Sequence, residues 1–209
     1  MIGFLRDFLP DLLAGLAVNL QIATFALLLG GTLAALMIPL RLRGGMAAAA
    51  ARFVGALFWA APTFVVMFFL VNVVPERWSV AGITVNFSGF IAIVMSQAVF
   101  ATAFLTDNGL EAIRHLRAGR QGSALLFLPQ CASAFFIMIT SSSQGAAIGV
   151  VDAVAVTLRA GERIPDISYR LLLFLAVVLL FVFIQRTAFH LIHLGREALL
   201  RRFGAAVTA

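Results

Sequence analysis

The chain of 209 residues has no lysine, a single cysteine, a single tyrosine and little charge of either sign. All 15 basic residues are arginines, and charged residues make up only 11% of the sequence. A nucleotide-binding P-loop needs a lysine to reach the phosphates, and Schiff-base chemistry needs a lysine amine. The absence of lysine therefore excludes an ordinary ATPase and a Schiff-base enzyme.

Cysteine and histidine are too few for most metal or nucleophile chemistry. Cys131, the only cysteine, excludes an internal disulfide and a thiolate cluster, and we expect it to be a small buried side chain. His190 and His193 lie three residues apart, with Glu197 nearby, and we expect interfacial residues here rather than metal ligands. No Gly-x-Ser-x-Gly or His-Glu-x-x-His motif is found. The sequence predicts no enzyme, no metal and no cofactor.

What the sequence has in excess is apolar surface. Hydrophobic residues make up 62% of the chain, and the mean hydropathy is +1.05. A water-soluble domain of this size needs more polar surface. The pattern predicts an all-α integral membrane protein, one domain over residues 1–209, with about five transmembrane helices of about 20 apolar residues or more each. The expected spans are residues 12–40, 53–74, 87–106, 124–151 and 171–189.

The distribution of the arginines predicts which side of the membrane each connecting segment occupies. Five crossings place the termini on opposite sides, and the segments 41–52, 107–123 and 186–209 then hold ten of the 15 arginines. The positive-inside rule places these segments in the cytoplasm. The prediction is an N-terminus outside the cell and a cytoplasmic C-terminus. Because the arginines lie between apolar runs, this topology explains the basic pI of about 11.4 without nucleic acid.

Polar residues within the apolar helices are the candidate site. The fourth span is interrupted by Thr140 and the run Ser141, Ser142, Ser143 and Gln144, and the third carries Gln97. Polar groups are costly in lipid and often mark a path through the protein, although helix–helix hydrogen bonds are the alternative. Both interpretations stay open for the run in the fourth span.

A stripe of small residues lies on the first span. Ala26, Gly30 and Ala34 recur at a spacing of four residues, which lets another helix approach closely. We expect packing within the chain rather than a subunit interface.

The segment 107–123 is the second candidate. Asp107 is expected to cap a short amphipathic helix that carries Arg114, Arg117 and Arg120 on one face. Such a basic helix can lie on lipid headgroups or dock on a cytosolic partner.

Five motifs, in order along the chain, resemble the permease subunits of ABC importers for polar amino acids, the histidine/glutamine-type group. They are Gly15–Leu20 (Gly-Leu-Ala-Val-Asn-Leu), Phe58–Leu70 around Ala-Ala-Pro, Asn108–Ile113 (Asn-Gly-Leu-Glu-Ala-Ile), Phe127–Cys131 (Phe-Leu-Pro-Gln-Cys) and Ser141–Asp152. The resemblance covers roughly residues 12–203. It implies the MetI-like ABC permease architecture.

The resemblance also implies function and partners. The chain would be the transmembrane subunit of an ABC importer in a bacterial inner membrane, carrying a small polar solute such as an amino acid. It would pair with a copy of itself or with a second permease, with cytosolic ATPase subunits and with an extracytoplasmic solute-binding protein. The translocation route would be lined by Gln97 and by Ser141, Ser142, Ser143 and Gln144. The residues nearest to the ATPase would be Arg114, Arg117, Gly119 and Gln121.

The sequence departs from the family in the loop that would contact the ATPase. Only residues 120–128 separate Gly119 from Pro129, about half of the usual segment, and the Glu-Ala-Ala element is lost or displaced to Glu111-Ala112-Ile113. The shortened loop favours an alternative, a permease-like membrane scaffold that binds partner proteins without transport. The polar run in the fourth span favours transport.

Overall fold

The computed structural model describes residues 2–80 and 83–204. The first half of the described chain contains four helices: α1 (Ile2–Arg43), α2 (Gly45–Ala60), α3 (Thr63–Val73) and α4 (Gly89–Arg117). The two strands β1 (Arg77–Val80) and β2 (Ile83–Asn86) pair antiparallel between α3 and α4. The second half consists of α5 (Gln121–Leu125), α6 (Phe127–Ser141), the 3₁₀ helix η1 (Ser142–Ile148), α7 (Ala153–Glu162) and α8 (Ile167–Gly204). The predicted all-α membrane class is confirmed, and the small hairpin was not predicted.

Among the described residues, four segments are long and apolar enough to cross a bilayer, or five if a bent helix pair counts as one span. The four are residues 6–43, 89–117, 121–148 and 167–202, and α2 with α3 forms a pair bent by 95°. The bend falls at Ala61-Pro62, where proline lacks the N–H that would continue the helical hydrogen bonding. The helices extend beyond the predicted spans because apolar composition marks only the part within lipid, whereas the polar ends continue into water.

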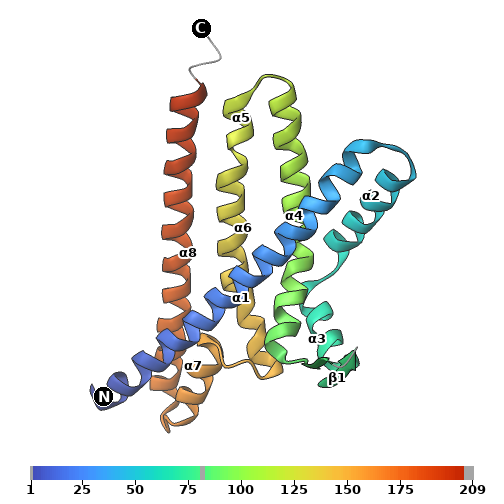
Figure 1. Ribbon diagram of the computed structural model, residues 1–209. Helices are drawn as coiled ribbons and strands as arrows, with labels where there is room; N and C mark the ends of the chain where they lie inside the picture. The colour runs from blue at the N-terminus through green and yellow to red at the C-terminus, as the bar shows by residue number, and fades with distance from the viewer. Residues whose placement is uncertain (1, 81–82, 205–209) are drawn as a thin grey trace.

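The connections gather at two ends of the bundle. Figure 1 shows the α1–α2 and α4–α5 connections and the C-terminal end of α8 toward one end. The N-terminus, α7 and the β-hairpin lie toward the other end. The first and last helices therefore end at opposite ends of the bundle, and the arginine-rich connections share one end.

Helix α1 runs diagonally across the bundle and packs chiefly on α4. At about 1.5 Å per residue its 42 residues span about 63 Å, roughly twice the thickness of a hydrocarbon core. The core at the crossing contains Ile22, Ala26, Met67, Ala101 and Met138. The small residues of α1 therefore face α4 within the same chain, as predicted.

Gly30 is the point of closest approach between α1 and α4. A Cβ atom at Gly30 would lie 2.5 Å from the Cβ of Ala101 and 3.0 Å from the carbonyl oxygen of Ala98. At Gly31, one residue along, the nearest such contact is 3.6 Å, to Cδ1 of Leu105. Only the first glycine is needed for helix contact.

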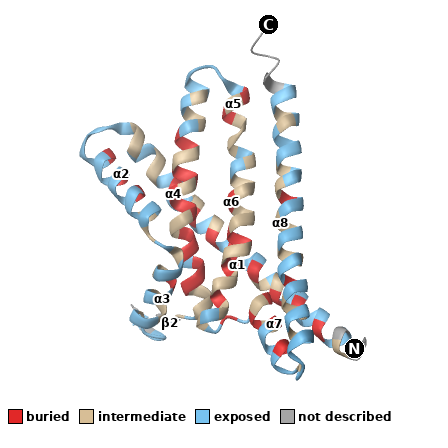
Figure 2. Ribbon diagram, turned by 180° about the vertical axis from the view of Figure 1, so that it is seen from behind, coloured by how far each residue is buried: buried red, intermediate tan, exposed pale blue. Residues whose placement is uncertain are grey.

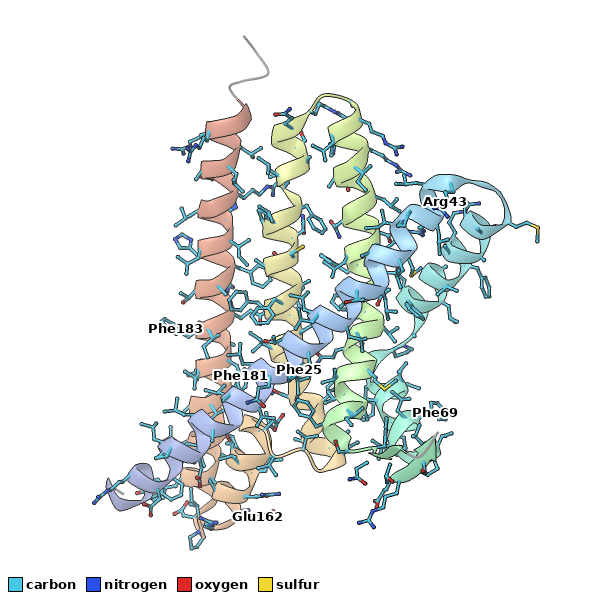
Figure 3. All side chains as sticks on the ribbon, in the orientation of Figure 1. Phe25, Arg43, Phe69, Glu162, Phe181 and Phe183 are labelled. Carbon is cyan, nitrogen blue, oxygen red and sulfur yellow. The ribbon has the colours of Figure 1, made fainter. Side chains whose placement is uncertain are left out.

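The outer surface of the bundle is apolar. Figure 2 shows α8 as mostly exposed or intermediate with few buried positions, and only 6% of its most apolar window is buried. In Figure 3, Phe183 lies on the outer side of α8, and it is 68% exposed. Phe181 packs instead against a cluster that contains Phe8 and Leu12 of α1. An apolar exposed helix face of this kind is suited to contact with lipid or with another subunit.

One expectation about the fold is wrong. Asp107 does not cap a new helix, because α4 continues without a break from Gly89 to Arg117. Gly109 does not interrupt it, and the carboxylate of Asp107 bonds to side chains of α1 and α2 instead of to backbone N–H groups. The basic residues Arg114 and Arg117 therefore form the last turn of a membrane-spanning helix.

The two neighbouring glycines of α1 provide a matched test of packing. We expect Gly30→Ala to lower the free energy of unfolding by about 1–3 kcal/mol, because the added methyl group meets backbone and Cβ atoms of α4. Gly31→Ala should leave it unchanged or raise it by up to about 1 kcal/mol, since alanine favours the helix. Thermal unfolding of both variants in detergent micelles measures the difference. Equal effects of the two substitutions would contradict the close contact.

Candidate functional site

The fourth span is interrupted within the protein, as predicted. Helix α6 ends at Ser141, and the chain tightens into the 3₁₀ helix η1. Gly149 follows with φ 85°, a left-handed conformation that glycine adopts without strain. Asp152 then caps α7 by accepting a hydrogen bond from the backbone N–H of Ala155 at 2.8 Å. The break therefore ends at the N-terminus of another helix.

Asn19 of α1 joins the two sides of this break. Its Nδ2 donates to Oγ of Ser142 at 2.7 Å and to a carboxylate oxygen of Asp152 at 3.3 Å. Its Oδ1 accepts from the backbone N–H of Ala153 at 3.2 Å. Asn19, Ser142 and Asp152 are all fully buried. One amide thus holds η1 and the N-terminus of α7 to the same turn of α1.

Burial raises the pKa of the Asp152 carboxyl above its usual range, although hydrogen bonds from Ala155 and Asn19 act in the opposite direction. The N-terminus of α7 supplies further positive potential at the same carboxylate. Asp152 was not predicted as a site residue, because it follows the apolar run of the fourth span and its position suggests the edge of the membrane. Its place at the end of the motif Ser141–Asp152, together with Asn19 in the first motif, is the sequence feature that could have indicated it.

Gln97 of α4 reaches the break from the opposite side. With its amide nitrogen toward the carbonyl of Met138 at 3.2 Å, its oxygen accepts from the backbone N–H of Ser142 at 2.8 Å and from Oγ of Ser141 at 3.3 Å. Gln97 is only 1% exposed. It adds side-chain bonds where the α-helix changes to a 3₁₀ helix, to the Ser142 N–H and the Met138 carbonyl, which also bond to each other. The structure therefore brings Gln97, Ser141 and Ser142 into one hydrogen-bonded cluster.

Several other polar side chains in the apolar helices bond within their own helix. Thr102 donates to the carbonyl of Ala98 at 2.6 Å, Ser96 to that of Ile93 at 3.0 Å, and Asn72 to that of Phe68 at 2.7 Å. Such bonds satisfy a hydroxyl or amide in a helix without any partner helix. Ser143 and Gln144 are partly buried, and Oε1 of Gln144 has no hydrogen-bond partner among the described residues.

Gly15 lets α1 approach the break. A Cβ atom at this position would lie 2.6 Å from the backbone nitrogen of Ala153 and 2.7 Å from the carbonyl carbon of Asp152. A cavity of about 520 Å³ opens beside this contact, with Asp7 and Asp11 on α1 and Arg159 on α7 among its lining residues. The closest contact between α1 and α7 therefore lies directly beside Asn19 and Asp152.

The predicted contact residues for an ATPase lie at the far end of the bundle. Arg114, Arg117, Gly119 and Gln121 are all exposed. Only residues 118–120 connect α4 to α5, and Gly119 takes φ 74° in that turn. The connection is short, as the sequence indicated, and forms a tight exposed turn.

An ion pair that the sequence did not predict joins three helices near this end. Arg41 of α1 donates a short hydrogen bond to Oδ1 of Asp107, and Nε1 of Trp59 donates to Oδ2 at 2.7 Å. The side chain of Arg41 is 15% exposed and that of Asp107 is 43% exposed. The carboxylate of Asp107 therefore connects α1, α2 and α4.

The surroundings of Cys131 and His193 in the fold bear on whether either side chain could act as a nucleophile or a metal ligand. Cys131 is half-buried, and Nε2 of His193 lies 3.1 Å from Oε1 of Glu197. Among the described residues no group of three His, Cys, Asp or Glu side chains is placed to hold a metal ion.

Replacement of Asn19 tests the network at the break. We expect Asn19→Ala to lower the free energy of unfolding by about 2 kcal/mol or more, because the Ala153 N–H and the Asp152 carboxylate stay buried without this partner. Gln21→Ala on an exposed face of the same helix is the matched control and should change it by less than about 0.5 kcal/mol. Thermal unfolding in detergent measures both. A loss at Asn19 no larger than at Gln21 would refute the network.

A double-mutant cycle tests the ion pair of α1 and α4. We expect Arg41→Gln and Asp107→Asn each to destabilise the protein and the double variant to cost less than their sum. The coupling should be about 1 kcal/mol, since the pair is partly exposed. Chemical or thermal unfolding of the four proteins gives the coupling, and additive losses would show that the two side chains do not interact.

Comparison with known proteins shows which solved structure has a similar fold. No protein-family model and no curated protein match the sequence. Among solved structures, the chain is similar to one described as a crystal structure of an amino acid ABC transporter with histidines, with a TM-score of 0.72 and 16% sequence identity. The match covers 93% of this chain and 96% of that chain. The protein therefore has the all-α membrane fold of an ABC transporter permease.

Proposed function

We propose that this chain is a transmembrane subunit of an ABC importer that carries a small polar solute of the amino acid class. The observation that carries the proposal is the similarity of fold to an amino acid ABC transporter over nearly the whole of both chains. The order of the five sequence motifs supports the same assignment. The chain itself would hydrolyse no nucleotide, and an ATPase subunit would supply that energy.

The arginine distribution supports an orientation. The end of the bundle with the α1–α2 connection, the α4–α5 turn and the end of α8 would face the cytoplasm, by the positive-inside rule. The N-terminus, α7 and the β-hairpin would face the outside, where a solute-binding protein would deliver its cargo. This arrangement suits the inner membrane of a bacterium.

The solute route would pass the break in the fourth span. Gln97 and Ser142 are fully buried and hold the break in shape. Ser141, Ser143 and Gln144 are partly accessible and would line the route where this chain meets a second permease subunit, identical or different. Oε1 of Gln144 is buried and has no partner among the described residues, so a rearrangement of the break that exposed it would offer a polar solute a hydrogen-bond acceptor.

The exposed turn after α4 would contact the ATPase through Arg114, Arg117, Gly119 and Gln121. Because Arg114 and Arg117 belong to the last turn of α4, a push on this turn would act directly along a helix that carries Gln97. Such a rigid connection would transmit nucleotide-driven motion to the break.

Charge reversal at the turn tests this function. The tagged full chain, purified from its native membrane, should bring an ATPase subunit with it and support nucleotide-dependent uptake of labelled amino acids in vesicles. Arg117→Glu should reduce both by about tenfold or more, since a partner complementary to this basic turn would meet a charge of the wrong sign. Mass spectrometry of the purified complex and uptake assays give the two readings.

Arg77→Glu, an exposed position in the hairpin at the opposite end, is the control and should leave ATPase association intact. Stable association with another membrane complex that contains no ATPase would support a scaffold and overturn the importer. Conductance without nucleotide would instead indicate a channel.

A further inference from the structure

A basic cleft lies where α1 and α4 end and α2 begins, beside the ion pair of Arg41 and Asp107. Its volume is about 650 Å³. Four arginines line it, Arg41, Arg52, Arg114 and Arg120. They come from three helices and from the turn after α4, so the fold, rather than a run of sequence, brings them together.

The positive charge of the cleft is only partly balanced. Two carboxylates line it: Asp107 is bonded to Arg41, and Glu111 lies 3.6 Å from His115. Among the described residues, the side chains of Arg52, Arg114 and Arg120 make no ion pair or hydrogen bond. Three guanidinium groups that share one cleft repel each other unless an anion lies between them.

One buried donor in the lining residues also lacks a partner. Nε of Arg41 is inaccessible to solvent and has no hydrogen-bond acceptor among the described residues. A buried donor of this kind is uncommon and indicates a missing acceptor. An oxyanion is the acceptor that suits a cleft lined by guanidinium groups.

The cleft lies next to apolar surface that faces outward. On α2, Phe53 follows Arg52 directly and is 72% exposed, while Met46 is 90% and Leu57 is 55% exposed. On α4, Leu116 is 55% exposed beside Arg117 and ahead of Arg120. The chain thus presents acyl-chain contacts and phosphate contacts side by side, which a soluble phosphate would not use.

We propose that this cleft binds the phosphate of an anionic phospholipid, whose acyl chains lie along the exposed face of α2. Arg52 on α2 and Arg120 in the turn after α4 hold the phosphate, and Arg41 on α1 contributes the charge of its guanidinium group. The site is independent of transport and of membrane orientation, because it requires only a leaflet with anionic lipid at this end of the bundle. Each arginine that lies near an anionic headgroup strengthens the binding of the lipid by electrostatic attraction.

Lipid titration of the purified full chain tests the site. Dioctanoyl phosphatidylglycerol is added in a neutral detergent, and lipid adducts are counted by native mass spectrometry while the unfolding temperature is recorded. The wild-type chain should bind this lipid and unfold at a higher temperature. Arg52→Gln/Arg120→Gln should weaken its binding by about tenfold or more.

The matched control removes the same charge elsewhere at the same end. Arg43→Gln/Arg201→Gln changes two exposed arginines that do not line the cleft, and its lipid affinity should stay within about twofold of the wild type. Without lipid, the cleft variant should unfold at the wild-type temperature or above it, since among the described residues neither side chain makes a hydrogen bond or ion pair and the remaining guanidinium groups repel each other less. The single variants Arg52→Gln and Arg120→Gln, each of intermediate affinity, test the site if the double variant is unstable.

Three results would overturn the proposal. Equal binding of dioctanoyl phosphatidylcholine would show that anionic charge is not recognised. Equal loss in the control variant would show a general charge effect. Inorganic phosphate that displaces the lipid at similar concentrations would assign the cleft to a free phosphate instead of a membrane lipid.

Discussion

A polypeptide inside a membrane has no water to satisfy its polar groups, so a break in a spanning helix must be satisfied by other side chains. Here Asn19 and Gln97 fulfil that requirement from α1 and α4. Each amide both donates and accepts, and each contacts the chain at or beside Ser142. The position of α7 depends on the same contacts, because Asn19 also accepts from its first residue, Ala153. The irregular part of the fold is thus fixed by two side-chain amides.

Glycine makes these polar contacts possible by bringing backbones together. Gly30 lets α1 touch α4, and Gly15, four turns away, lets it touch the start of α7. A side chain at either position would separate the helices and lengthen the bonds of Asn19. The diagonal path of α1 follows, since one straight helix must meet α7 at one end and α4 farther along.

Sequence alone predicted the apolar spans, the small-residue face of α1 and the break at Ser141–Gln144, because each depends on a local pattern. Which polar residues cross between helices could not be predicted. Ser96 and Thr102 bond to their own helix, whereas Gln97, adjacent to Ser96, bonds to η1. That difference depends on the rotation of α4 relative to its neighbours. Asp107 was misjudged for the same reason, since its partners Arg41 and Trp59 are distant in sequence.

The absence of lysine has a further consequence for the end of the bundle that carries the arginines. Guanidinium groups keep their proton at any pH in a cell, whereas lysine amines can lose theirs when partly buried. The positive charge that the arginines place around the α4–α5 turn and the cleft is therefore insensitive to acidification. Ionic strength, through screening over about 10 Å, becomes the main environmental variable that can change attraction at this surface.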